Sequence, residues 1–176
     1  TERRNAEAKI SHLARFDELT ELPNRVNFRN EIERLLTGEH GRDQLSALLF
    51  VDLDQFKQVN DTLGHPCGDQ LLCAVSERLR EMLRPEDFVA RFGGDEFVIL
   101  LEDVCDPDYT NAIVERLQQA LRKPFALQGK EVFAPASFGV VVNTQDYEQP
   151  EMIIRDADAA MYHAKQAGKG RYCFAD

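Results

Sequence analysis

The sequence predicts an α+β fold: a ferredoxin-like βαββαβ core with one added helix, in which a central antiparallel sheet is flanked by helices on one face. Three observations lead to this prediction. Residues 45–51 form a nearly continuous apolar run, which is typical of a buried central strand. Two strand-like runs, 88–90 and 97–101, enclose two glycines and two acids, as in a β-hairpin. Segments between the strands carry apolar residues at helical spacing.

The N-terminal part predicts two helices. Residues 2–15 form a short helix with one apolar stripe, and we interpret 1–15 as a linker helix from an upstream domain, the alternative being a frayed terminus. Pro23-Asn24 interrupts the chain before an amphipathic helix that we expect to end at Gly38. The apolar stripe of this second helix comprises Val26, Phe28, Ile32, Leu35 and Leu36.

The remaining elements alternate between helical and strand-like patterns. After the first strand we expect helices at 55–63 and 66–83, the hairpin, a helix at 107–121, strands at 125–127 and 131–142, a helix at about 150–167 and a closing strand at 172–174. Pro135 lies inside the longest of these strand-like runs and implies an edge or a bulge, because proline cannot donate a hydrogen bond to the sheet. We assign residues 16–176 to one domain.

Composition is that of an ordinary globular domain and argues against several classes of protein. The chain has 176 residues, 43% of them apolar, which is enough for one core. Its net charge of −10 argues against a nucleic-acid partner, since phosphate backbones require a basic face. The four cysteines form no Cys-x-x-Cys pair and fit a reducing compartment. No apolar run approaches the ~20 residues that cross a bilayer. We therefore expect a cytoplasmic fragment without direct membrane contact. This expectation is compatible with a membrane anchor elsewhere in the parent protein.

Two acidic elements are predicted to approach each other. Asp52-Leu53-Asp54 follows the central strand, and Asp95 and Glu96 lie at the tip of the hairpin. Adjacent acids repel each other unless a cation lies between them. Mg²⁺ prefers hard oxygen ligands of this kind and is usually completed by substrate phosphates. Each element alone could merely end a strand or fill a turn, but together they predict a site for Mg²⁺ or Mn²⁺.

Several spaced motifs resemble those of one known family. The run Gly93-Gly94-Asp95-Glu96-Phe97 looks like the signature of GGDEF domains, the diguanylate cyclases. Other segments resemble further motifs of that family in the same order along the chain; they lie at 17–25, 52–61, 64–69, 158–165 and 168–169. The resemblance extends over residues 16–174, which is essentially the whole chain.

This resemblance implies a reaction and a set of partners. Diguanylate cyclases join two GTP molecules into cyclic di-GMP and release pyrophosphate, by attack of a ribose 3′-hydroxyl on an α-phosphate. Each subunit of a homodimer would present one GTP, because ring closure needs two nucleotides facing each other. The resemblance also implies a palm-type fold, an upstream sensor domain in the parent chain, and cyclic di-GMP as both product and inhibitor.

The resemblance also assigns the metal ligands. Asp52 and Asp95 match the family's metal-binding carboxylates, and the backbone carbonyl of Leu53 is the expected third ligand. Glu96 is expected as a further ligand or as a helper in deprotonating the attacking hydroxyl. We place Asp95, Glu96 and Lys57 in the catalytic set. Asp54 is less directly tied to metal, and the bland interpretation makes it the N-cap of the following helix.

Guanine recognition is assigned by the same resemblance to Asn60 and Asp69, whose amide and carboxylate suit the Watson–Crick edge of guanine. Bland alternatives exist, since Asn60 could end a helix and Asp69 could be an acid at a helix start. Lysines are expected to hold the phosphates, together with backbone N–H groups at 55–57. The full substrate-binding set is Phe56, Lys57, Asn60, Asp69, Lys165 and Lys169. The family often has arginine where Lys169 stands, and lysine lacks the bidentate fork of arginine.

A regulatory motif precedes the hairpin. Arg84 and Asp87 form an Arg-x-x-Asp whose spacing from Gly93 resembles the family's inhibitory site, where product binds and stops synthesis. Arg116, on the next predicted helix, is a candidate second arginine. A surface turn around Pro85 is the alternative.

Three functions compete at this stage. The first is an active dimeric diguanylate cyclase. The second is a catalytically silent domain that binds GTP or cyclic di-GMP and regulates an attached enzyme. The third is another palm-type enzyme, such as a purine nucleotide cyclase. The complete set of residues expected to bind metal, guanine and phosphate favours the first function.

Overall fold

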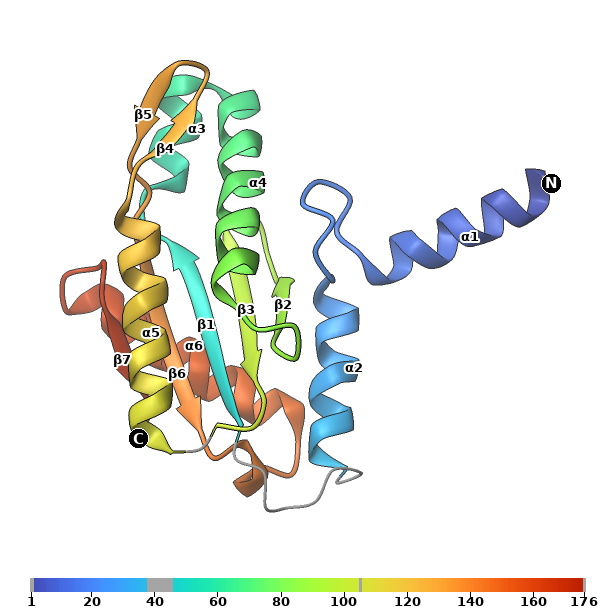
Figure 1. The fold of residues 1–176 in the computed structure, drawn as a ribbon, viewed down its shortest axis with the longest axis vertical. Coiled ribbons are helices and arrows are strands. Elements are labelled where there is room, and N and C mark those ends of the chain that lie inside the picture. Colours follow the sequence, from blue (N-terminus) through green and yellow to red (C-terminus); the bar gives the residue numbers. More distant parts are fainter. Residues whose placement is uncertain (1, 38–45, 105, 176) are drawn as a thin grey trace.

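A five-stranded mixed sheet forms the centre of the molecule (Figure 1), with the strand order β2-β3-β1-β6-β7. The computed structural model describes residues 2–37, 46–104 and 106–175. The strands of this sheet are β1 (Ala47–Leu53), β2 (Phe88–Arg91), β3 (Glu96–Leu101), β6 (Ala136–Val142) and β7 (Tyr172–Phe174). The first four pair antiparallel, as predicted, and β7 runs parallel to β6 at one edge.

The parallel edge strand departs from the predicted antiparallel sheet. A long helix, α6 (Pro150–Gln166), lies between β6 and β7 in the chain and packs against both. A strand that returns after a crossover helix enters its sheet parallel to the strand before it. The last strand therefore had to be parallel, although the core order of the predicted fold is confirmed.

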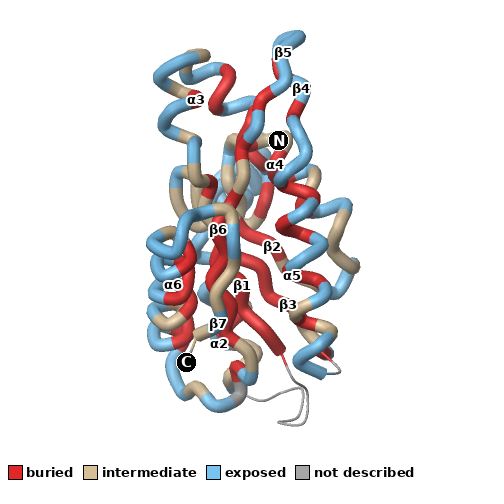
Figure 2. Tube along the Cα trace, turned by 90° about the vertical axis from the view of Figure 1, so that its left-hand side faces the viewer, coloured by how far each residue is buried: buried red, intermediate tan, exposed pale blue. Residues whose placement is uncertain are grey.

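The helices cover both faces of the sheet, so the prediction of helices on one face is wrong. They are α1 (Glu2–Arg15), α2 (Arg25–Leu36), α3 (Phe56–Leu63), α4 (His65–Met82), α5 (Pro107–Arg122) and α6, with a short 3₁₀ helix at Thr144–Asp146. Leu49 and Val51 of β1 pack in a cluster with α4 and α5, whereas Leu48 and Phe50 pack in a second cluster with α2 and α6. Side chains alternate across a strand, so a continuous apolar run needs cover on both sides. Figure 2 shows the resulting buried positions along β1 and β6.

Close packing of α6 on the sheet depends on one glycine. A Cβ at Gly139 of β6 would overlap the backbone carbonyl of Ala157 and the backbone of Met161 on α6. The absence of a side chain lets the helix backbone lie directly on the strand. This contact fixes the height of the C-terminal end of α6, which carries Lys165, over the end of β1.

The long strand predicted at 131–142 is split in two. Its first part is β5 (Lys130–Val132), which pairs with β4 (Phe125–Leu127) in a separate two-stranded hairpin. Pro135 lies at the break, as its missing N–H requires, and its carbonyl accepts a hydrogen bond of 2.9 Å from the N–H of Asp54.

The N-terminal helix projects away from the rest of the fold (Figure 1), and none of its residues is buried. Ile10 and Leu13 are 67% and 44% exposed. Its interpretation as a linker from an upstream domain stays a prediction. On α2, Val26 is 57% exposed and lies outside the stripe in which we had placed it. The predicted helix end at Gly38 and strand start at Leu45 lie outside the described residues. Across the described ranges, no helix is both long enough and apolar enough to span a membrane.

Candidate active site

Strand pairing brings the two acidic elements together at one end of the sheet. In the antiparallel register of β1 with β3, Asp52 lies opposite Glu96. The N–H of Leu53 donates a hydrogen bond of 3.2 Å to the carbonyl of Asp95. Antiparallel pairing of these strands places the end of β1 beside the start of β3, so the segments meet although more than forty residues of chain separate them.

Asp52 is a buried carboxylate with one oxygen unsatisfied. Its Oδ2 forms an ion pair of 3.1 Å with Nζ of Lys165, and its side chain is 15% exposed. Its Oδ1 is buried and has no hydrogen-bond partner among the described residues. Burial and the charge of Asp95 raise the pKa of Asp52 to about 7, against the opposing effect of Lys165. Such an oxygen is suited to accept a cation.

Glu96 shares this acidic environment. Burial raises the pKa of its carboxyl, followed by the charges of Asp95 and Asp158, whereas Arg25 and Lys165 oppose the shift. The carboxylate folds over Gly93, where a Cβ would overlap its Oε1.

The two glycines of the hairpin leave space around the loop, and neither has an unusual backbone conformation. Neither Gly93 nor Gly94 has a positive φ, so the backbone conformation of this turn does not by itself require glycine at either position. Gly93 makes room for the side chain of Glu96, and no atom lies within 4 Å of the position of a Cβ at Gly94. The surface above Gly94 is therefore open to an approaching ligand.

The donors at this end of the sheet fit a divalent metal that a substrate completes. Within the described part of the chain, no three His, Cys, Asp or Glu side chains converge as a complete metal centre. The unpaired oxygen of Asp52 and the neighbouring Asp95 offer carboxylate oxygens instead, which make a partial set of donors. Mg²⁺ is usually held in this way, by one or two carboxylates together with water and phosphate oxygens.

Asp54 is not the N-cap of α3, which was the alternative role considered for it. Gln55 occupies that position at the start of α3 and makes no side-chain capping bond. The carboxylate of Asp54 instead accepts hydrogen bonds from the hydroxyl of Ser137 and the N–H of Gly170. It therefore joins β1 to β6 and to the turn before β7.

The predicted phosphate-binding lysines come from three separate segments around the acids. Lys165 lies in the last turn of α6, with Nζ 3.1 Å from Asp52 and 4.0 Å from Asp54. Lys169 is exposed in the following turn at φ 62. Lys57 is exposed in the first turn of α3, whose leading N–H groups lack a side-chain cap. The exposed ammonium group of Lys57 and the uncapped N–H groups of α3 both suit an anion.

The two residues predicted to bind guanine lie on neighbouring helices, which approach each other closely where Gly68 has no side chain. Asn60 lies on α3 and Asp69 in the first turns of α4. A Cβ at Gly68 would overlap the carboxamide of Asn60, so glycine lets that amide lie against the start of α4. Phe56 is half-buried and packs on the core beneath α3.

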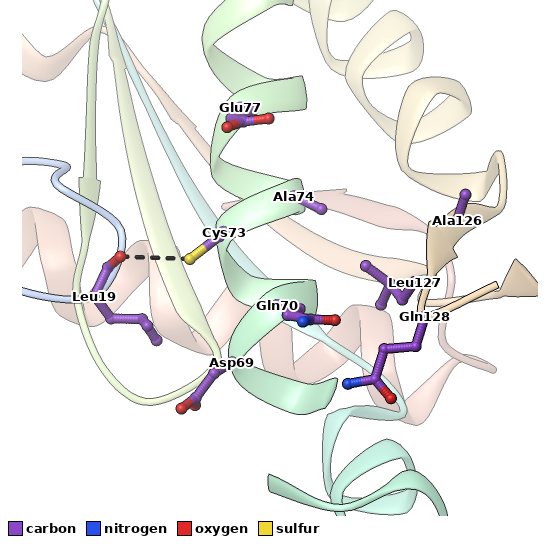
Figure 3. A pocket seen from close by; sticks show the side chains of 9 residues that line it. All are labelled: Leu19, Asp69, Gln70, Cys73, Ala74, Glu77, Ala126, Leu127 and Gln128. Carbon is purple, nitrogen blue, oxygen red and sulfur yellow. Dashed lines mark hydrogen bonds between the residues drawn. The ribbon is translucent and has the colours of Figure 1, made fainter. Parts of the chain in front are cut away.

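A hollow of about 410 Å³ lies beside Asp69 on the outer face of α4 (Figure 3). Its wall includes Leu19, whose carbonyl accepts a bond from the thiol of Cys73, and Leu127 of β4. None of these three residues was predicted to have a role. Leu19 lies within the motif at 17–25, which was the available signal, whereas no motif marks Cys73 or Leu127.

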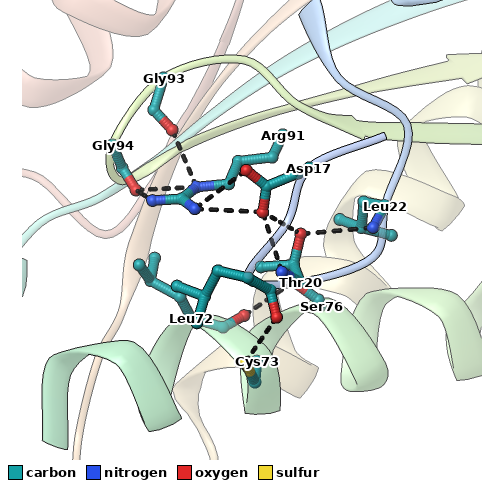
Figure 4. A network of polar contacts seen from close by, with 10 residues as sticks. Asp17, Thr20, Leu22, Leu72, Cys73, Ser76, Arg91, Gly93 and Gly94 are labelled. Carbon is teal, nitrogen blue, oxygen red and sulfur yellow. Dashed lines mark hydrogen bonds and ion pairs between the residues drawn. The ribbon is translucent and has the colours of Figure 1, made fainter. Parts of the chain in front are cut away.

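A network that the sequence analysis missed holds the hairpin loop (Figure 4). Arg91 donates to both carboxylate oxygens of Asp17, at 3.2 and 3.1 Å, and to the carbonyls of Gly93 and Gly94. Although burial opposes it, hydrogen bonds from Thr20 and Arg91 lower the pKa of Asp17. A second hollow, of about 330 Å³, adjoins this network beside Arg25 and Phe92. Asp17 and Arg91 are 74 positions apart, and no local pattern pairs them.

The predicted inhibitory motif is already paired. Arg84 donates to both oxygens of Asp87 and, at 2.6 Å, to the carbonyl of Glu102. The Asp87 side chain is 1% exposed, and the Arg84 guanidinium lies 5.2 Å from the ring of Tyr109 on α5. Arg116 lies two turns further along α5, on nearly the same helix face, and is exposed. No contact among the described residues joins it to Arg84 or Asp87.

Comparison with known proteins identifies the family to which this arrangement corresponds. The model of the diguanylate cyclase GGDEF domain matches residues 14–171. The bifunctional diguanylate cyclase/cyclic di-GMP phosphodiesterase MucR of Pseudomonas aeruginosa is 40% identical over 96% of this chain and 24% of its own length. Diguanylate cyclase TpbB of the same species is 39% identical over 93% of this chain and 38% of its length. The cyclic di-GMP phosphodiesterase NbdA, also from this species, is 40% identical over 97% of this chain and 22% of its length.

Solved structures give the same result. The GGDEF domain of TpbB superposes with a TM-score of 0.86 at 35% identity, covering 92% of this chain and 94% of that one. The coiled coil and GGDEF domain of DgcB from Caulobacter crescentus, in complex with c-di-GMP, superposes with a TM-score of 0.87 at 25% identity, covering 99% and 92%. This chain spans well under half the length of the three curated relatives described above.

Proposed function

The chain belongs to the GGDEF family of diguanylate cyclase domains, and we propose that it joins two GTP molecules into cyclic di-GMP with release of two pyrophosphates. The observation that carries this proposal is the buried, unpaired Oδ1 of Asp52 beside Asp95 at the end of β1. An uncompensated buried oxygen is costly unless a ligand occupies it. An active site provides such a ligand.

Asp52, Asp95 and the carbonyl of Leu53 would hold the divalent cation, which we propose is Mg²⁺, with Mn²⁺ as a substitute. When bound, such a metal stabilises the charge on the attacking and leaving oxygens of phosphoryl transfer. Burial and the charges of Asp95 and Asp158 raise the pKa of Glu96, which makes its carboxylate a stronger base. This equips Glu96 to take the proton of the ribose 3′-hydroxyl in addition to its expected role as an oxygen donor.

Guanine would bind between α3 and α4. The carboxylate of Asp69 accepts from the N1–H and N2–H₂ of guanine, and the amide of Asn60 can both donate and accept. The hollow beside Asp69 provides an apolar wall through Leu19. Lys57, Lys165 and Lys169, with the N–H groups at the start of α3, would then neutralise the triphosphate.

One such site holds one nucleotide, so synthesis requires two copies of the domain facing each other. The exposed apolar residues of α1, Ile10 and Leu13, offer a surface on which a linker helix can bring two chains together. Product inhibition would act at Arg84 and Asp87 with Arg116 as a second arginine. Arg84 forms an ion pair with Asp87 in the structure, so product would have to replace that ion pair.

A second candidate is a silent domain that binds GTP or cyclic di-GMP. It is favoured by the relative NbdA, which is named as a phosphodiesterase although this region is 40% identical to it. Retention of Asp52, Asp95, Asn60 and Asp69 together favours the active enzyme, since a silent domain has no need of the metal-binding pair.

Incubation of the protein with GTP and Mg²⁺, followed by chromatographic identification of the products, tests the proposal. Cyclic di-GMP as the product supports it, and its formation per protein molecule should rise with protein concentration because two chains are needed. GTP bound but unchanged would favour the silent domain, and cyclic GMP would favour a different palm-type cyclase. Asp156→Asn is the matched control, because Asp156 bonds Tyr147 away from this site.

A further inference from the structure

The carboxylate of Asp54 is buried beneath the predicted phosphate-binding lysines and is fully occupied by the protein. Its side chain is 2% exposed. One oxygen accepts from the hydroxyl of Ser137 at 2.6 Å, and the other accepts from the N–H of Gly170 at 2.9 Å. A buried carboxylate is retained at low cost only when such bonds satisfy it. Asp54 is therefore held in one place by two segments, β6 and the turn before β7.

The turn that Asp54 holds has an unusual backbone. Gly168, Lys169 and Gly170 have φ values of 131, 62 and 58. The left-handed conformation of a residue with a side chain, here Lys169, costs about 1–2 kcal/mol and persists only where neighbouring contacts impose it.

Those contacts converge on a single residue, Gly170, whose N–H and carbonyl belong to two successive peptide groups. The N–H of Gly170 is bound by Asp54, and its carbonyl accepts from Nε2 of Gln118 at 2.6 Å and from a guanidinium nitrogen of Arg122 at 2.7 Å. Gln118 is buried, whereas Arg122 is exposed. We call Asp54, Gln118 and Arg122 the turn clamp. It fixes the peptide groups on both sides of Gly170, and hence the direction in which the preceding Lys169 leaves the turn.

The same carboxylate also locates Lys165. The ammonium group of Lys165 lies 3.1 Å from Asp52 and 4.0 Å from Asp54. Asp54 is committed to Ser137 and Gly170, whereas Asp52 has a free oxygen. If Asp52 turns to a bound ligand, the charge of Asp54 still attracts Lys165, which has three donors to share between a carboxylate and a phosphate.

We propose that Asp54 is a positioning residue that sets Lys165 and Lys169 for the phosphates of the nucleotide, through the turn clamp and through its charge. This proposal rests on the proposed function, since it takes the phosphates of GTP as the ligand of both lysines. Asp54 itself touches neither substrate nor metal.

Binding to two ligands separates positioning from plain structural support. The first ligand is the Mg²⁺ complex of guanosine 5′-[α,β-methylene]triphosphate, in which loss of pyrophosphate is blocked. The second is guanosine, which has the base and no phosphate. Asp54→Ala should weaken the analogue about 10- to 100-fold, as expected for misplaced charged contacts, and leave the affinity for guanosine within about threefold. Calorimetry measures the first affinity, and NMR titration measures the second.

Hydrogen exchange of the Gly170 amide provides the structural readout. In Asp54→Ala it should become at least ~10-fold faster, because the bond that protects it is gone. Asp54→Asn keeps an acceptor for this amide and loses the charge near Lys165, so exchange should stay near that of the unmodified protein while the analogue binds about 3- to 10-fold more weakly. Asp156→Asn is the control and should change neither quantity.

Arg122→Ala serves as the second variant if Asp54→Ala does not fold, because Arg122 is exposed and the carbonyl of Gly170 keeps its bond from Gln118. It should weaken the analogue about threefold and spare guanosine. Equal losses for the analogue and guanosine, or unchanged analogue binding in variants whose Gly170 amide exchanges faster, would overturn the positioning role alone. An unmodified protein that binds no analogue would overturn both this proposal and the proposed function.

Discussion

Two half-buried acids flank the hairpin loop and behave in opposite ways. Asp17 receives hydrogen bonds from Thr20 and Arg91 on both oxygens, and its pKa is lowered although burial acts against this. Asp52 has one lysine on one oxygen and nothing on the other, and burial with the charge of Asp95 raises its pKa to about 7. Both lie at similar depth, with 21% and 15% of their side chains exposed.

The difference separates a carboxylate whose partners all come from the protein from one that keeps a buried, unpaired oxygen. The protein supplies every partner that Asp17 needs, so ionisation of Asp17 stabilises the folded chain. At Asp52 the folded chain disfavours the charge, and a cation would reverse that preference. Burial and charge alone do not distinguish the two positions; the hydrogen-bond partners do.

Asp52→Asn should give the largest effect and the most direct test of this contrast. We expect synthesis of cyclic di-GMP to fall at least ~100-fold, because a metal ligand is lost. The ligand-free protein should become more stable at pH 8, by up to about 4 kcal/mol, since each unit of pKa shift corresponds to about 1.4 kcal/mol. Product assays and denaturant unfolding measure the two effects. A variant that loses stability would break the comparison, because Asp52 would then be a structural acid.

Arg84→Ala tests another acid, Asp87. Like Asp17, Asp87 accepts hydrogen bonds from an arginine on both carboxylate oxygens. If product replaces this ion pair, the variant should lose inhibition, with the inhibition constant for cyclic di-GMP rising more than ~10-fold as bidentate contacts disappear. The initial rate should stay within about twofold. Inhibition curves measured with added cyclic di-GMP check this. Unaltered inhibition would place the Arg84–Asp87 pair with Asp17, as support for the fold.

Asp17→Asn should cost stability, in contrast to Asp52→Asn. Removing one partner of a partly buried ion pair leaves Arg91 without its counter-charge, and we expect a loss of about 2 kcal/mol. Glu7→Gln is the matched control, because the Arg3–Glu7 pair is exposed on α1 and should change stability by less than about 0.5 kcal/mol. Both values come from urea unfolding. Equal losses in the two variants would remove the special status of Asp17.

The pH dependence of stability should show both signs in one protein. The folded-state pKa of Asp52 lies above its ordinary value of 3.8, so its contribution favours the folded state at low pH and is lost as pH rises from about 4 to 7. The folded-state pKa of Asp17 is lowered, so its contribution is present above its ordinary pKa of 3.8 and is lost as pH falls below that value. The melting temperature of the ligand-free protein should therefore fall from pH 5 to 8. Asp52→Asn should reduce the pH dependence in this range and leave the dependence at lower pH unchanged.

Much of the fold was readable from local pattern. The apolar run of β1, the hairpin around Gly93 and the helices on either side were predicted with boundaries close to those observed. The two-sided burial of β1 was also present in the pattern, since Leu48 to Val51 are apolar without alternation, but we assigned one covered face. Pro135 correctly marked an interruption, although the sequence alone did not show that the strand ends there and a separate hairpin begins.

The residues of the candidate site could be named from the sequence, but the hydrogen bonds and ion pairs that hold them could not. Motif resemblance named Asp52, Asp95, Asn60 and Asp69, and strand register and Gly68 bring these into two adjacent groups. The ion pair of Asp17 with Arg91 and the bonds of Asp54 to Gly170 join positions 74 and 116 residues apart. No periodicity links such positions, because each bond exists only once other elements have placed its two ends.

The sequence by itself therefore determined which residues are chemically equipped, since side-chain type and local spacing are properties of the chain. Tertiary structure decided which of those residues have their bonds satisfied from within. Asp17, Asp52 and Asp54 are the same residue type, yet the first is held by Arg91, the third by Gly170, and the second keeps a buried oxygen free. The free energy of a buried charge depends on the few atoms that surround it, and those atoms arrive from distant segments only when the chain folds.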